Sequence, residues 1–85
     1  MTKANWVIGE TERHMIEVSA SVWSGKVMIR VDGRDITSTY QIGVSNKSYK
    51  FTVGEKERHD VEIRVGGLVN ANFTLFVDGK LIGTA

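Results

Sequence analysis

The chain has 85 residues, a formal net charge of +1 and no cysteine or proline, and its acidic and basic residues are interspersed. This length predicts a single domain over residues 1–85, and the lack of cysteine excludes disulfides and thiolate metal sites and suits the reducing cytoplasm, where we expect the protein to be. The balanced charge, together with the lack of an apolar leader or membrane-length run, argues against nucleic-acid and membrane partners.

The first half of the chain, which we place at about residues 5–44, alternates apolar and polar residues. Period two is typical of β-strands with one buried face, and helical spacing is nearly absent. The dipeptide Asp32-Gly33 predicts a type I′ hairpin turn, which needs a positive φ at both residues. The predicted strands of this half are residues 5–8, 14–20, 26–32 and 34 to about 44.

The second half, at about residues 48–84, has the same organisation. Its hairpin signal is Asp78-Gly79, and its predicted strands are residues 48–53, 59–65, 72–78 and 81–84. Eight short antiparallel strands joined by hairpins form either a sandwich or a small closed barrel. We predict an all-β fold, an eight-stranded antiparallel β-sandwich, because the inward residues are mostly branched aliphatics that fill a thin core.

One six-residue stretch occurs twice. Residues 9–14 (Gly-Glu-Thr-Glu-Arg-His) are followed 45 positions later by residues 54–59 (Gly-Glu-Lys-Glu-Arg-His). The stretch Val-Asp-Gly at 31–33 returns 46 positions later at 77–79, so one inserted residue is expected near 69–72. Self-similarity at a fixed spacing marks duplicated units. The sequence therefore predicts an internal pseudo-twofold duplication.

Two histidines, His14 and His59, open equivalent strands with inward parity. One hypothesis is a metal-dependent enzyme in which both histidines ligate an ion. A zinc site takes three or four protein ligands, however, and outward parity places Glu17 and Glu62 away from the imidazoles. We therefore predict no catalytic, cofactor-binding or metal-binding residue, and we expect each histidine to donate a hydrogen bond to a loop carbonyl.

Three apolar residues stand out from the predicted core. Met28 and Phe76 have outward parity on their strands, and Trp23 falls in a loop. Aromatic residues and methionine are enriched at interfaces, so we predict an interaction surface at these three for a protein partner or for self-association. The exposed outer strands offer a second route, by strand addition. The alternative is a small-ligand or carbohydrate module in which Trp23 and Tyr40 stack on sugars.

Several motifs follow one another in a defined order along the chain. They are His14-x-Ile16-Glu17, Ser24-Gly25-Lys26, Ile29-x-Val31-Asp32-Gly33-Arg34, Tyr40, Phe51-x-Val53-Gly54 and Val77-Asp78-Gly79-Lys80. From about Trp6 to Ile82 their order and spacing resemble one domain of the Fas apoptotic inhibitory molecule family. Proteins of that family are β-rich, non-enzymatic and built of two such domains, and they are associated with suppressing death-receptor signalling and countering protein aggregation under stress. The resemblance implies a single-domain version that serves as a non-catalytic protein-interaction domain.

Overall fold

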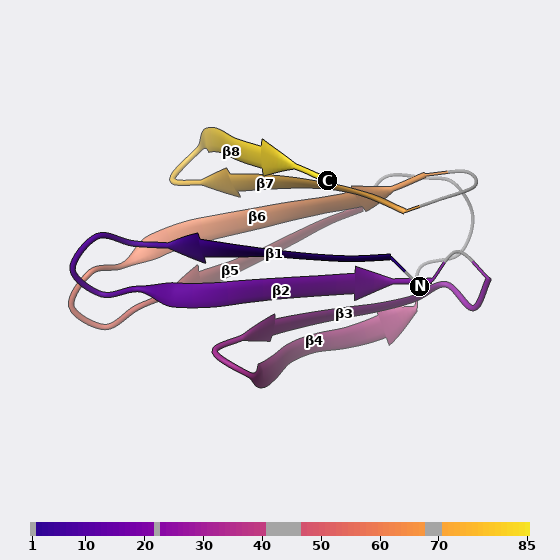
Figure 1. Ribbon diagram of the computed structural model, residues 1–85, viewed down its shortest axis with the longest axis horizontal. Coiled ribbons are helices and arrows are strands. Elements are labelled where there is room, and N and C mark those ends of the chain that lie inside the picture. Colours follow the sequence, from indigo (N-terminus) through magenta and orange to yellow (C-terminus); the bar gives the residue numbers. More distant parts are fainter. Residues whose placement is uncertain (1, 22, 41–46, 68–70) are drawn as a thin grey trace.

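The chain forms two four-stranded antiparallel sheets that face each other (Figure 1). The structure is a computed structural model, and it describes residues 2–21, 23–40, 47–67 and 71–85, within which there is no helix. The strands are β1 (Thr2–Ile8), β2 (His14–Ala20), β3 (Lys26–Val31), β4 (Arg34–Tyr40), β5 (Lys47–Val53), β6 (His59–Gly66), β7 (Asn72–Val77) and β8 (Lys80–Thr84). The first sheet has the order β1-β2-β3-β4 and the second β5-β6-β7-β8, which confirms the predicted eight-stranded sandwich.

The strand boundaries differ from the predicted ones at a few ends, each for a local reason. β1 begins at Thr2 because this residue pairs with Ala20 at the far end of β2. The predicted continuation of the fourth strand over 41–44 lies outside the described residues. β3 and β7 end one residue early because Asp32 and Asp78 belong to the turns, with φ of 53° and 52° followed by glycines at 81° and 80°. The two type I′ turns are thus confirmed.

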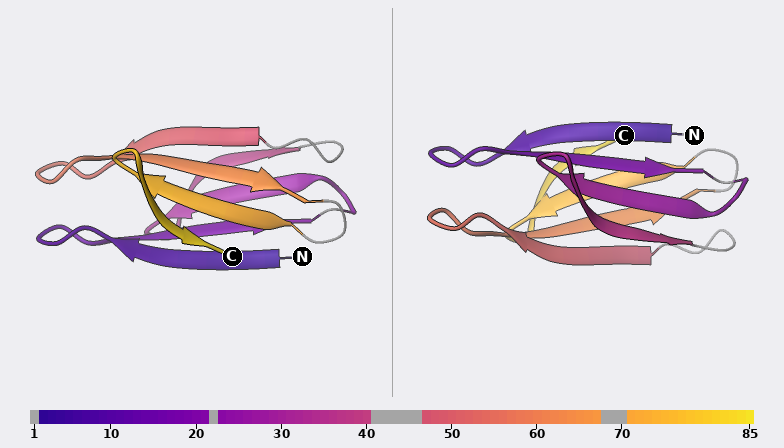
Figure 2. Two further views of the ribbon diagram at one scale, coloured as in Figure 1. Left: turned by 90° about the horizontal axis from the view of Figure 1, so that it is seen from above. Right: turned by 90° about the horizontal axis from the view of Figure 1, so that it is seen from below.

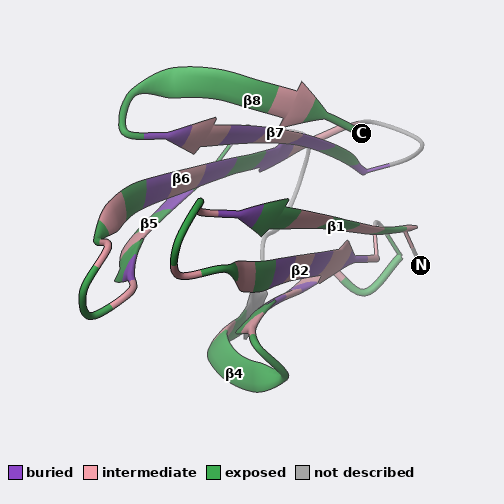
Figure 3. Cartoon of the chain, turned by 60° about the vertical axis from the view of Figure 1, so that its left-hand side comes forward, coloured by how far each residue is buried: buried purple, intermediate pink, exposed green. Residues whose placement is uncertain are grey.

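The core lies between the sheets and consists of the alternate, inward residues of each strand. The most deeply buried side chains of the first sheet are Ile16, Val18, Val27 and Ile29, and those of the second are Ile63, Phe73 and Leu75. Buried residues mark the central strands in Figure 3, whereas β4 and β8 are exposed along most of their length. Burying one such side chain contributes about 1.5–3 kcal/mol, so the sandwich depends on this alternation.

Each sheet contains one irregularity, and the two lie at equivalent positions. The pairing shifts between Ile29 and Arg30 in β3 and between Leu75 and Phe76 in β7. The extra residue is Ile36 in β4 and Ile82 in β8. A bulge turns the following residues to the other face, so strict alternation does not assign the inward residues of these outer strands.

The registers also locate the extra residue of the second half. Ala20 pairs with Val27 in the first sheet, and Val65 pairs with Phe73 in the second. Up to Val65 the equivalent positions are 45 residues apart, and from Phe73 onward they are 46 apart. The extra residue lies in the β6–β7 connection, in which residues 68–70 lie outside the described part of the chain.

One side chain closes the sandwich where the sheets meet. Trp6 on β1 packs against the core, and a Cβ atom placed on Gly83 of β8 would come within 2.7 Å of its indole Nε1. Figure 2 shows β8 passing close to β1 at this edge. The lack of a side chain at Gly83 therefore lets an outer strand of the second sheet approach an outer strand of the first.

Candidate functional site

Two loops with nearly the same sequence project from the same end of the sandwich. Residues 9–13 join β1 to β2, and residues 54–58 join β5 to β6. Figure 2 shows them one above the other, the first in indigo and the second in salmon. We call them the crossed loops, because each one binds the glutamate of the other.

The carboxylate of Glu57 binds the main chain of the first loop. It accepts hydrogen bonds from the N–H groups of Glu10 at 2.9 Å, Thr11 at 2.8 Å and Glu12 at 3.3 Å. The Thr11 hydroxyl donates a further bond at 2.7 Å. Three successive amide groups and a hydroxyl thus converge on one carboxylate.

Glu12 does the same in the opposite direction. Its carboxylate accepts hydrogen bonds from the N–H groups of Glu55 at 2.9 Å, Lys56 at 2.9 Å and Glu57 at 3.4 Å. The matching distances show that the contact is reciprocal. Because one partner in each bond is charged, these bonds are stronger than those between neutral groups, and they tie the two sheets together at this end.

A glycine opens each crossed loop, and the geometry requires it. Gly9 and Gly54 have φ of 98° and 97°, a conformation that residues with a side chain rarely adopt. A Cβ atom at Gly9 would also overlap the carbonyl oxygen of Glu12, and one at Gly54 would overlap that of Glu57. The loop backbone can therefore curl around the incoming carboxylate only with glycine at this position.

Each loop glutamate also belongs to a chain of three side chains in its own half. In the first half, His14 donates from Nδ1 to Asp32 Oδ2 and from Nε2 to Glu12 Oε2, both at 2.6 Å. In the second, His59 donates to Asp78 at 2.7 Å and to Glu57 at 2.5 Å. With a carboxylate at each ring nitrogen, both nitrogens act as donors, which is the imidazolium form.

The expectation that the histidines donate to loop carbonyls, without a carboxylate nearby, is therefore wrong. The alternation correctly predicted that Glu17 and Glu62 point away from the imidazoles. The carboxylates that bind the imidazoles come instead from the loops and the turns. The type I′ turn directs the Asp32 side chain back to β2, where its Oδ1 also accepts the N–H of Met15 at 2.9 Å. Asp78 accepts the N–H of Asp60 at the same distance.

The pKa values of these groups shift in opposite directions. Hydrogen bonds raise the pKa of His14, first through Asp32 and then through Glu12, and they raise that of His59 through Asp78 and then Glu57. The amides of Lys56 and Glu55, followed by His14, lower the pKa of Glu12 to about 2. His59 is the largest cause that lowers the pKa of Glu57. Each cluster therefore favours a protonated imidazole between two ionised carboxylates.

The structure does not bring the two histidines together. They lie in separate clusters, and both ring nitrogens of each are engaged by carboxylates. Over the described ranges, no group of three or more His, Asp or Glu side chains is placed to hold a metal ion. What the arrangement does chemically is to fix two loops and two turns to one another through charged hydrogen bonds.

The three predicted surface residues lie on different parts of the molecule. Trp23 is 94% exposed in the β2–β3 connection. Met28 lies on the outer face of the first sheet, between Ser19 and Ser38. Phe76 lies on the outer face of the second sheet, so the three residues do not form one continuous surface.

An apolar pair on the outer face of the first sheet was missed by the sequence analysis. Val7 and Met15 are cross-strand partners, and they are 61% and 44% exposed. The equivalent partners of the second sheet are Thr52 and Asp60, which are joined by a hydrogen bond of 3.4 Å. The difference is visible in the repeat itself, where Val and Met of one half align with Thr and Asp of the other.

The second sheet has an apolar outer pair at a different place. Phe76 pairs with Leu81, which is 61% exposed, and the guanidinium of Arg64 lies 4.6 Å from the Phe76 ring centre. The equivalent partners of the first sheet, Arg30 and Asp35, form an ion pair of 2.7 Å. The two-residue turn at Asp78-Gly79 places Phe76 opposite Leu81, and the bulge begins only beyond this pair, so the turn signal could have identified the partnership.

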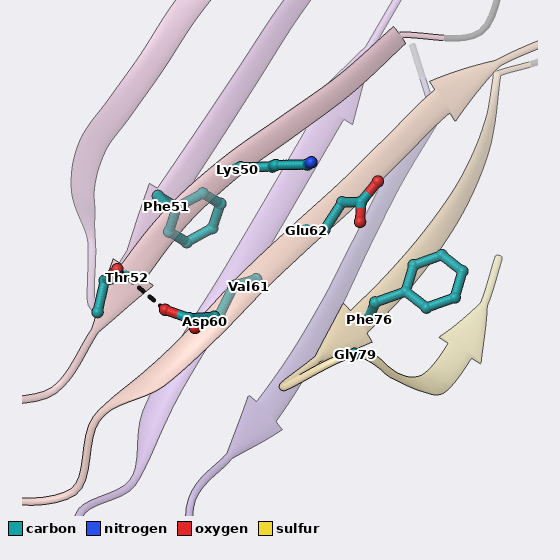
Figure 4. A pocket seen from close by; sticks show the side chains of 8 residues that line it. All are labelled: Lys50, Phe51, Thr52, Asp60, Val61, Glu62, Phe76 and Gly79. Carbon is teal, nitrogen blue, oxygen red and sulfur yellow. Dashed lines mark hydrogen bonds between the residues drawn. The ribbon is translucent and has the colours of Figure 1, made fainter.

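A shallow hollow of about 440 Å³ lies beside Phe76. Lys50, Glu62 and Phe76 follow one another across β5, β6 and β7 on this outer face (Figure 4). An aromatic ring therefore stands next to groups of both charges. This combination of apolar and charged groups suits a peptide segment better than a purely apolar or purely charged ligand.

A comparison with protein-family models identifies the family of the chain. The part of the chain that the structure describes contains no helix long and apolar enough to cross a membrane. Comparisons with curated proteins and with solved structures gave no match. The model of the family described as Fas apoptotic inhibitory molecule (FAIM1) matches residues 2–84, which is nearly the whole chain. The chain therefore belongs to the Fas apoptotic inhibitory molecule (FAIM1) family.

Proposed function

We propose that the protein is a non-catalytic, cytoplasmic protein-interaction domain that binds exposed apolar segments of partly unfolded proteins and slows their aggregation. Family membership supports this class of function, since the family is associated with countering aggregation under stress. The observation that carries the proposal is the apolar pair of half-buried Phe76 and exposed Leu81 on the outer face of the second sheet.

The surroundings of this pair favour a peptide partner. The ring of Phe76 is half-buried and held against Arg64, so ordering it on binding costs little conformational entropy. Lys50 and Glu62 provide a polar rim at one side. Interfaces typically combine an aromatic or arginine centre with such a rim.

We assign the crossed loops a structural role within this function. Both nitrogens of His14 and of His59 are occupied by carboxylates, which leaves neither imidazole available as a general base. We further infer that the two halves are copies of one ancestral unit, because their loops, turns and bulges correspond position by position. The outer faces then diverged, and one of them became the binding face.

The repeat itself supplies the variants that test this proposal. Phe76→Arg combined with Leu81→Asp transfers the polar Arg30–Asp35 pair of the first sheet to the second. Because the same pair is tolerated at the equivalent site, we expect the thermal midpoint to change by only a few degrees. We expect suppression of aggregation of a heat-denatured client, followed by light scattering, to fall at least fivefold.

The matched control changes the other outer face. Val7→Thr combined with Met15→Asp transfers the Thr52–Asp60 pair to the first sheet, and this variant should suppress aggregation as well as the unchanged protein does. Loss of suppression in the control alone would place the binding face on the first sheet and overturn the assignment. Full suppression by both variants would reject Phe76 and Leu81 as the binding face, and no suppression by the unchanged protein at several-fold excess would reject the function.

A carbohydrate-binding function is the second candidate, and the 94% exposure of Trp23 is the observation that favours it. A ring this open can stack on a sugar face. The Tyr40 side chain, its expected partner, lies outside what the structure describes. Titration with glycans should change the fluorescence of the unchanged protein but not of Trp23→Ala, in which Trp6 remains as an internal reference.

A further inference from the structure

We propose that each crossed loop is a carboxylate-binding site built from the main chain, and that the glutamate of the opposite loop is its resident ligand. This inference does not depend on the proposed interaction function. It rests on the donors that surround the Glu57 carboxylate in the first loop and on their repetition around Glu12 in the second.

The donors in the first loop use both oxygens of the ligand. Oε2 of Glu57 accepts the N–H of Glu10 and faces His59 Nε2, while Oε1 accepts the N–H groups of Thr11 and Glu12 and the Thr11 hydroxyl. Consecutive amides that point into one concavity form a nest, which is a recurrent anion-binding arrangement. The site therefore recognises a whole carboxylate group and not a single charge.

The second loop shows that the main chain is the receptor. Lys56 stands where the first loop has Thr11, so the side-chain hydroxyl is absent there. The amides of Glu55, Lys56 and Glu57 nevertheless bind the Glu12 carboxylate at nearly the same distances. Recognition thus survives a change of side chain, because the glycine-dependent loop shape and the amide groups are what bind.

The carboxylate that fills each loop belongs to a residue that is far away in the sequence. Glu57 is 46 residues from Thr11, and Glu12 is 44 residues from Lys56. A carboxylate that is not covalently part of the opposite loop can satisfy the same donors. The chemical class of ligand is therefore a small monocarboxylate. Acetate fits best, because its heavy atoms match those that Glu57→Ala removes beyond Cβ.

The experiment is rescue of Glu57→Ala by acetate. The thermal midpoint is measured in sodium acetate and in sodium chloride at equal ionic strength. The pH is 6, at which His59, the histidine that faces the carboxylate of Glu57, is still protonated. We expect the midpoint to rise with acetate along a saturable curve, by about 5 °C near saturation, with little change in chloride. The unchanged protein, whose site is filled, should show no acetate-specific rise.

Two further variants make the result decisive. Glu57→Gln keeps the site occupied by an amide, so acetate should not rescue it. Glu12→Ala vacates the second loop and should be rescued like Glu57→Ala. If either alanine variant is unfolded in chloride, recovery of the folded state in acetate supports the proposal. Failure of acetate to stabilise both alanine variants, or equal rescue of Glu57→Gln or by chloride, would overturn it.

Discussion

The two halves of the molecule are alike at the end with the crossed loops and different on their outer faces. At the loop end, each half presents the same chain of glutamate, histidine and aspartate with distances that agree to about 0.1 Å. On the outer faces, Val7 and Met15 stand where the other half has a polar pair. At Phe76 and Leu81, by contrast, the second half is apolar where the first half has a polar pair.

This difference distinguishes the residues that hold the two sheets together from those on the outer surface. The loop glycine, glutamate and histidine are the same in both halves, because each glutamate carboxylate depends on the shape and the main-chain donors of the other loop. Positions on the outer faces are free of that constraint, since an exposed ion pair such as Arg30–Asp35 contributes only about 0–1 kcal/mol. An apolar pair can replace it with little loss of stability and so become available for binding.

The largest effect on stability is expected in the hydrophobic core, to which both halves contribute alike. Leu75 is completely buried between the sheets, and Leu75→Asp places a carboxylate there without a partner. The cost is on the order of 5 kcal/mol or more, comparable with the whole stability of a domain of this size. We expect the cooperative thermal transition to disappear. Thr74→Asp, on the outward neighbour opposite Arg64, should keep it, and an unchanged melting curve for Leu75→Asp would refute the core assignment.

A smaller but still large effect is expected at the loop glycines, where the halves should respond alike. Gly9→Ala and Gly54→Ala each force a side chain into a positive φ and against a loop carbonyl. We expect each to lower the free energy of unfolding by about 3 kcal/mol or more. Gly33→Ala is the control, because a Cβ there meets nothing within 4 Å and only its φ of 81° is unfavourable. Denaturant unfolding gives the values, and an effect at one loop glycine without the other would show that the two loops are not equivalent.

The mildest effect is expected from pH. The raised pKa values of His14 and His59 stabilise the fold below the ordinary histidine value of 6.5, and this contribution is lost as pH rises through the folded-state values. The lowered pKa of Glu12 stabilises the fold above the ordinary value of 4.5, and this contribution is lost as pH falls toward about 2. The thermal midpoint should therefore be highest between about pH 4.5 and 6.5 and fall by several degrees toward pH 9.

Replacement of the histidines isolates the alkaline side of that profile. In the double variant His14→Gln and His59→Gln, the midpoint should be lower at pH 6 and nearly constant from there to pH 9. A midpoint of the unchanged protein that does not vary between pH 6 and 9 would contradict the imidazolium assignment. Replacing one histidine at a time should give about half of the effect, because the two clusters are built alike.

The amino-acid sequence by itself determined the strands, the two Asp-Gly turns and the sandwich. These features follow from local chemistry: alternation decides which face of a strand is buried, and a type I′ turn needs residues that tolerate positive φ. The twofold occurrence of Gly-Glu-x-Glu-Arg-His also marked both loops correctly. The motif order predicted the family that the comparison with known proteins then confirmed.

Only the tertiary structure decided what those loops do. Glu57 meets the amide of Thr11 because the two sheets stack with their loops at the same end, and no pattern within one half indicates a ligand in the other. Asp32 reaches His14 across 18 positions of chain because the turn folds its strand back. Gly83 pairs with Leu75 because of a bulge, which leaves no clear mark in the sequence, and it lies against Trp6 of the other sheet. Contacts of this kind arise from packing between distant segments, and local propensity carries no information about them.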